Sequence, residues 1–245
     1  MTIKKIKSAY WYTYMVLSAV VLVTKHRLFR LKKGKVSKAE FLTFMNENAR
    51  KWADRQIKNT GTKINIYGLD HLPAGNCLFI ANHQSYFDIG FFLAYIPQQK
   101  GFISKKEVEK VPFLGKYMTD LRCLFIDRGN MKQSMKIILE GIEILKDDYS
   151  MVIFPEGTRS LDGKVDPFKA GSFKLATKSG VPIVPVTIDG AMDILKKGEK
   201  LINKTTVNFI IHKPIETKDM SKEEMANVHN VVHGIVQDGI GLYPR

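Results

Sequence analysis

Two short segments carry residue types that could transfer a group onto a phosphate-bearing alcohol. The first, 82–88, reads NHQSYFD and places a histidine five residues before an aspartate. A carboxylate on one ring nitrogen would fix the tautomer of His83 and leave the other nitrogen free as a base. The second, 154–160, reads FPEGTRS and offers the carboxylate of Glu156 and the guanidinium of Arg159. Because a guanidinium can hold a phosphate with two parallel hydrogen bonds, base and cation together indicate this kind of transfer.

The spacing of His83 and Asp88 has meaning only in one structural setting. On a regular helix, five residues at about 100° each would separate the two side chains by about 140°. They can meet only if His83 lies in a turn ahead of a helix that begins near Asp88. His233 and Asp238 repeat the interval within a helical pattern that no strand precedes, so we expect His233 to be a helix-face residue. The other histidines are expected to be surface or structural residues: His26, His71, His212 and His229.

Other chemistries find little support in the sequence. No Gly-x-Ser-x-Gly elbow surrounds Ser85, so this serine has no support as a nucleophile. A metal site at His83 and Asp88 lacks a third ligand with sensible spacing. The two cysteines, Cys77 and Cys123, lie in apolar runs and form no disulfide framework, which is typical of a reducing compartment.

The body of the chain predicts an α/β fold, in which a mostly parallel central sheet is flanked by helices. From about residue 62, short β-rich runs alternate with helical stretches. Several runs are continuously apolar, as in strands covered on both faces. The expected strands are 63–67, 77–81, 101–104, 124–127, 151–154, 181–188 and 206–212. The expected helices are 87–95, 112–120, 130–147, 167–179 and 221–237.

Both segments follow expected strands, and so do two further cations, Lys105 and Arg128. Ligands bind at the carboxyl edge of open α/β sheets. We therefore expect Lys105, Arg128 and Arg159 to converge near His83 as an anion pocket. Taken alone, Lys105 or Arg128 is explained nearly as well by a solvated surface charge. Glu156 could hold a substrate hydroxyl, and the alternative for its segment is a surface turn with an incidental ion pair.

The net charge of +14 is concentrated in residues 1–60, which carry +11. Such a basic segment can serve nucleic acid or anionic lipid. Its aromatic residues interleave with aliphatic ones, which disfavours nucleic acid. Residues 8–24 are uncharged and as a helix would be about 25 Å long, just short of the hydrocarbon core of a bilayer. This helix could lie in the membrane interface or insert partly, span the membrane, or be a signal peptide without an evident cleavage site.

A second basic helix is expected over 37–58, with one apolar face. A basic amphipathic helix with aromatics is typical of the membrane interface, and the alternative is that its apolar face packs on the core. We expect a membrane-anchoring motif over 1–60 and an α/β domain over 61–245, with Gly61 as the linker. The residues of the apolar face are Phe41, Phe44, Met45, Ala49, Trp52 and Ala53.

The motifs together resemble those of the glycerolipid acyltransferase family over residues 62–215. The first and third of the family's blocks are similar to 82–88 and 154–160 and are the most specific. The remaining blocks are similar to 104–107, 125–128, 168–171 and 181–186.

The resemblance implies transfer of an acyl chain from acyl-CoA or acyl-carrier protein to the 2-hydroxyl of lysophosphatidic acid, which gives phosphatidic acid. His83 would deprotonate that hydroxyl as its oxygen attacks the thioester, and Asp88 would orient His83. The acceptor itself is then the nucleophile, and no acyl-enzyme, metal or cofactor is implied. The other implied contacts are to the acceptor phosphate, from Lys105, Arg128 and Arg159, and to its glycerol, from Glu156, Gly157 and Thr158.

The N-terminal motif would hold such an enzyme at the cytoplasmic face of the inner membrane, near anionic lipid. Two alternatives stay open at this point. The acceptor could be glycerol-3-phosphate or another lysolipid, or the chain could be a non-catalytic protein that binds lipid surfaces.

Overall fold

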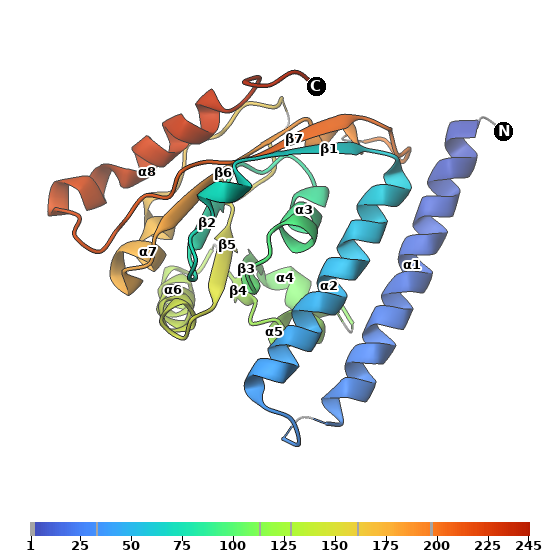
Figure 1. Cartoon of the computed structure of the whole chain (residues 1–245), viewed down its shortest axis with the longest axis horizontal. Helices are drawn as coiled ribbons and strands as arrows, with labels where there is room; N and C mark the ends of the chain where they lie inside the picture. Colours follow the sequence, from blue (N-terminus) through green and yellow to red (C-terminus); the bar gives the residue numbers. More distant parts are fainter. Residues whose placement is uncertain (1–2, 33, 113, 128, 161, 197) are drawn as a thin grey trace.

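A seven-stranded sheet organises the chain (Figure 1). The computed structural model describes residues 3–32, 34–112, 114–127, 129–160, 162–196 and 198–245. In spatial order the strands are β1 (Lys63–Tyr67), β7 (Thr206–Ile211), β6 (Ile183–Asp189), β2 (Leu78–Ala81), β5 (Ser150–Ile153), β3 (Lys100–Lys105) and β4 (Leu124–Ile126). The expected strands and the mostly parallel α/β architecture are confirmed, and the strand ends differ from the expected ones by at most two residues.

Strand direction places the carboxyl ends of five strands at one edge. β6, β2, β5, β3 and β4 run parallel, whereas β7 pairs antiparallel with β6 and β1 runs parallel to β7. The segments that follow β2, β5, β3 and β4 therefore emerge on the same side of the sheet. This arrangement brings residues far apart in sequence to one edge.

Helices cover both faces of the sheet (Figure 1). Alternation along β2 sends Phe79 into one core cluster and Leu78 into the other. One face carries α6 (Met131–Lys146), α7 (Lys174–Ser179) and α8 (Lys222–Asp238), and the other carries α1 (Ile3–Arg30), α2 (Lys38–Thr60) and α3 (Phe87–Tyr95). The two short helices α4 (Lys106–Glu109) and α5 (Leu114–Asp120) follow β3. The helix expected over 167–179 is a 3₁₀ turn, Ala170–Phe173, followed by α7.

The apolar face of α2 packs on the core rather than facing outward. Phe41, Met45 and Ala49 are buried in the same cluster as α3 and the sheet. A capping box between Ser37 and Glu40 starts the helix. Of the two interpretations of this face, the structure therefore shows the core-packing one. The core continues across residue 60, and a division there into an anchor and an α/β domain stays a prediction.

Helix α1 lies outside α2 and exposes a long apolar surface. By length and composition it could cross a membrane, and only 11% of its most apolar 18-residue stretch is buried. Three buried side chains of α1 contact the body: Ser8 Oγ accepts from the Ile202 N–H at 2.9 Å, Trp11 Nε1 donates to the Gln56 carbonyl at 3.0 Å, and His26 Nε2 lies 2.8 Å from Asp120 Oδ2. The exposed apolar residues are Ile3, Ile6, Tyr10, Val16, Leu17, Val20, Val21 and Leu28.

Candidate active site

His83 lies in the turn between β2 and α3 that its spacing to Asp88 requires. Asp88 is the second residue of α3, and its Oδ2 lies 2.7 Å from Nδ1 of His83. The His83 side chain is 18% exposed, and within the described part of the chain its Nε2 has no hydrogen-bond partner. The pairing of these two side chains is therefore confirmed, and it leaves Nε2 available for a further hydrogen bond.

Asp88 is fully buried and strongly constrained. Its Oδ2 also accepts from the backbone N–H groups of Gln84 at 2.7 Å and Ser85 at 2.8 Å. Because Oδ2 accepts from these two N–H groups, it is also placed as the acceptor for an N–H at Nδ1 of His83. The ring of Phe154 stacks on the His83 ring with centroids 4.3 Å apart. Carboxylate and aromatic ring together fix the tautomer and orientation of the imidazole.

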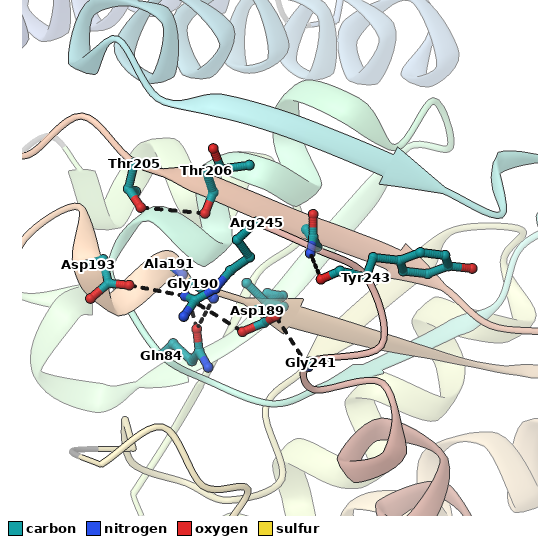
Figure 2. Close-up of polar contacts among 12 residues, drawn as sticks. Gln84, Asp189, Gly190, Ala191, Asp193, Thr205, Thr206, Gly241, Tyr243 and Arg245 are labelled. Atoms are coloured by element: carbon teal, nitrogen blue, oxygen red, sulfur yellow. Dashed lines mark hydrogen bonds and ion pairs between the residues drawn. The ribbon is translucent and has the colours of Figure 1, made fainter.

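The residues on either side of His83 tie the loop to the end of β6. The Asn82 side chain donates to the Ile188 carbonyl and accepts from the Ile188 N–H, each at 2.8 Å. Gln84 Oε1 accepts from the N–H groups of Gly190 and Ala191, each at 3.0 Å (Figure 2). Asn82 and Gln84 are buried, and sequence reasoning assigned neither a role. Their only sequence signal is that two amide side chains flank the histidine directly after an apolar strand.

The turn after β6 is in turn contacted by the C-terminal residue Arg245. Arg245 Nη1 contacts Asp193 Oδ2 at 3.0 Å and Asp189 Oδ1 at 3.8 Å (Figure 2). Gly190 has φ +96°, and a Cβ there would lie 2.7 Å from the Thr206 carbonyl oxygen. The conformation that presents two N–H groups to Gln84 therefore requires glycine at this position.

The Glu156 side chain contacts backbone N–H groups, whereas the sequence predicts that it holds a substrate hydroxyl. Its Oε1 accepts from the His83 N–H at 2.6 Å, and its Oε2 accepts from the Asp166 N–H at 3.0 Å. Glu156 is 5% exposed. The pKa of Glu156 is raised to about 7, chiefly by burial. The two backbone hydrogen bonds oppose this rise in the pKa, and the nearby carboxylates of Asp166 and Asp88 add to it.

Arg159 lies against Tyr86, which sequence reasoning did not single out. The guanidinium carbon is 3.7 Å from the ring centroid, and Nη2 donates to the Tyr86 hydroxyl at 3.1 Å. Tyr86 is 67% exposed, so the pair lies at the surface of the site. Gly157 has φ +80° and its N–H donates to the Phe154 carbonyl, so the expected tight turn is present. Thr158 is exposed.

Lys105 ends β3 at the same edge of the sheet. β3 is two strands from β2, about 10 Å at the usual strand spacing. The side chain is exposed and lines a cavity of about 190 Å³ together with Glu107, Asp127 and Gly129. Arg128 lies outside the described residues. Convergence of the cations on one anion stays a prediction.

His233 shows that the His-to-Asp interval alone is uninformative. It lies on α8, where Nε2 is 3.2 Å from the Val165 carbonyl and the ring packs edge-on against Phe168. The expectation of a helix-face histidine is confirmed.

These contacts define the class of site. A carboxylate-oriented imidazole at the carboxyl edge of a mostly parallel sheet can take a proton from a hydroxyl. A guanidinium after the neighbouring strand can hold an anion. Such an arrangement can serve group transfer assisted by a general base.

Comparison with known proteins identifies the family. Residues 63–189 match the family described as Acyltransferase, and the chain belongs to that family. It is 38% identical over 156 residues to "1-acyl-sn-glycerol-3-phosphate acyltransferase BAT2, chloroplastic" of Brassica napus, covering 62% of this chain and 45% of that protein. It is 30% identical to the "Probable 1-acyl-sn-glycerol-3-phosphate acyltransferase" of Mycoplasma pneumoniae, covering 70% of this chain and 69% of that one.

A solved structure resembles nearly the whole chain. The crystal structure of the 1-acyl-sn-glycerophosphate (LPA) acyltransferase, PlsC, from Thermotoga maritima superposes with a TM-score of 0.81 at 29% identity. That similarity covers 97% of this chain and 96% of the other. By contrast, the chain spans about half of the length of the plant relatives from Brassica napus and Arabidopsis thaliana, at 45% and 44%.

Proposed function

We propose that this protein transfers an acyl chain from an acyl thioester to the 2-hydroxyl of 1-acyl-sn-glycerol-3-phosphate, giving phosphatidic acid. The observation that carries the proposal is the 2.7 Å contact between His83 Nδ1 and Asp88 Oδ2. It leaves Nε2 of an oriented base at the sheet edge that also carries the loop of Arg159. The names of the relatives support the choice of acceptor.

In the proposed mechanism, Nε2 of His83 takes the proton from the acceptor hydroxyl as its oxygen attacks the thioester carbon. A carbon–oxygen bond forms, the carbon–sulfur bond breaks, and the departing thiolate receives the proton from the imidazolium. Asp88 stabilises that imidazolium. Arg159, Lys105 and Arg128 bind the acceptor phosphate.

Gly157 and Thr158 are proposed to shape the glycerol site. The thioester donor is acyl-CoA or acyl-carrier protein, and the proposed reaction uses no metal or cofactor.

We further propose that α1 holds the enzyme in the interface at the cytoplasmic face of the inner membrane. Its exposed apolar face supports insertion, whereas its other side is fixed to the body through Trp11 and His26. A full span would carry the charged helix α2, with ion pairs such as Lys58 with Asp54, into the hydrocarbon at high cost. Anionic lipid would attract the basic N-terminal quarter.

The decisive experiment is turnover by the purified full chain in vesicles. Lysophosphatidic acid, glycerol-3-phosphate and other lysolipids should be offered in competition, each with acyl-CoA and with acyl-carrier protein. We expect lysophosphatidic acid to be acylated fastest. Preference for another acceptor would contradict the proposed substrate, and vesicle binding without acyl turnover would favour a non-catalytic lipid-binding protein.

A further inference from the structure

The main chain of His83 is held on both sides by the loop that follows β5. Its N–H donates to Glu156 Oε1 at 2.6 Å, and its carbonyl accepts from the Ser160 N–H at 2.8 Å. The same loop supplies Phe154, whose ring stacks on the imidazole. One loop therefore fixes the backbone position of the base and one face of its ring.

Glu156 makes this link with both oxygens of its side chain, which neither a shorter carboxyl nor an amide reproduces. Its two oxygens accept from two N–H groups, those of His83 and Asp166, which lie 73 and 10 residues away in the sequence. An amide in its place would offer one oxygen and one NH₂, so one N–H group would face another donor. An aspartate is shorter by one methylene and cannot reach both. With both oxygens engaged and 5% exposure, Glu156 is poorly placed to bind a substrate hydroxyl.

We propose that Glu156 is a positioning residue, which acts through the His83 main chain and does not contact the acceptor. The contact sets where the His83 backbone lies, and Asp88 and Phe154 then orient the ring from that point. A misplacement of the base by about 1 Å can cost on the order of 100-fold in rate. The proposal deepens the acyltransferase function proposed above, and its kinetic test rests on that function. It replaces the glycerol-binding role that the sequence predicts for Glu156.

Kinetics separate positioning from acceptor binding. In the Glu156→Gln variant we expect kcat to fall about 10- to 100-fold, while KM for lysophosphatidic acid stays within about twofold. The matched control is Asp162→Asn in the same loop, which also removes one negative charge. Asp162 is exposed, and an asparagine keeps the oxygen that accepts from Ser160 Oγ and the Lys164 N–H. A several-fold rise in KM with kcat unchanged would assign Glu156 to acceptor binding and overturn the proposal.

A second readout needs no substrate. The His83 amide proton, assigned by NMR of the full chain in detergent micelles, should exchange slowly in the wild type and at least tenfold faster in Glu156→Gln. The Gln84 amide, which donates to Asp88, should keep its exchange rate and serves as the internal control. Equal His83 exchange rates in both proteins would overturn the proposal. Faster exchange in a protein that acylates none of the acceptors would contradict the proposed function but support the positioning role.

Glu156→Asp covers the case in which the glutamine variant does not fold. We expect it to retain one of the two backbone contacts, so that kcat and His83 protection lie between those of the wild type and Glu156→Gln. Wild-type values for both quantities in Glu156→Asp would also overturn the proposal.

Discussion

The His83 imidazole is held through Nδ1, so Nε2 alone is available to a hydroxyl. We expect His83→Ala to lower kcat by about 10² to 10⁴, since a positioned general base contributes that range. The matched control is His233→Ala, which removes a histidine with the same interval to an aspartate. It should keep kcat within about twofold when both are assayed well below their unfolding temperatures. Wild-type turnover by a folded His83→Ala protein would refute the mechanism.

Tyr86 presents the guanidinium of Arg159 by stacking and by one hydrogen bond. An exposed cation–π contact is worth about 0.5–1 kcal/mol, so Tyr86→Leu should raise KM for the phosphate-bearing acceptor about two- to fivefold. KM for the thioester should not change. Tyr86→Phe keeps the ring and should show the smaller effect. Equal rises in both Michaelis constants would indicate a general disturbance of the site instead.

The buried carboxyl of Glu156 links stability to pH. Its pKa is raised from 4.5 to about 7 chiefly by burial, so between these values the folded protein holds a proton that the unfolded chain has released. The stability contribution is present below pH 4.5 and is lost as the pH rises through 7. Urea unfolding at intervals from pH 4.5 to 7.5 should show a decline that is shallower in Glu156→Gln. Parallel curves for the two proteins would contradict this assignment.

At the scale of elements, the loop after β2 is hydrogen-bonded to the ends of the two strands that flank β2 in the sheet. The ends of β6 and β5 hold it through Gln84 and Glu156 on opposite sides. The loop that carries His83 is therefore tied to the ends of both strands that flank β2. A substitution at the end of β6 or β5 should therefore change the catalytic rate although the substituted residue does not contact the substrate.

Gly190 offers a direct test of the β6 side. Gly190→Ala adds a Cβ within 2.7 Å of the Thr206 carbonyl oxygen at a positive φ, and should lower both the unfolding free energy and kcat. Gly180→Ala is the matched control, because Gly180 also has a positive φ (+78°) but has open space around a Cβ. It should cost about 1 kcal/mol from backbone strain alone and leave kcat unchanged. Denaturant unfolding and initial rates measure both quantities. Equal loss of kcat in the two variants would contradict the link through Gln84.

Local patterns predicted the elements and the His83–Asp88 pair well, because both depend on short stretches of chain. The links from Gln84 to Gly190 and from Glu156 to His83 join residues 106 and 73 positions apart. They depend on strand order, which alternating strands and helices do not specify. The apolar face of α2 illustrates a second limit, since the same periodicity serves a core and a membrane interface.

At the scale of the whole molecule, the exposed face of α1 should govern membrane association. We expect Leu17→Glu with Val20→Glu to reduce sedimentation with anionic vesicles at least tenfold, because two charges replace exposed apolar side chains. Val231→Glu with Leu242→Glu adds the same charges at exposed positions elsewhere and should leave binding near the wild-type level. Circular dichroism confirms that each variant is folded. Undiminished binding by the α1 variant would remove this helix from the proposed membrane contact.

The burial of α2 decides where this chain can be shortened. Truncation at Gly61 would strip Met45, Ala49, Ala53 and Ile57 from the core and leave an apolar layer bare above α3. The product would aggregate rather than dissolve. A variant with a more polar surface should instead keep both N-terminal helices. Only the outward apolar side chains of α1 should be replaced by polar residues.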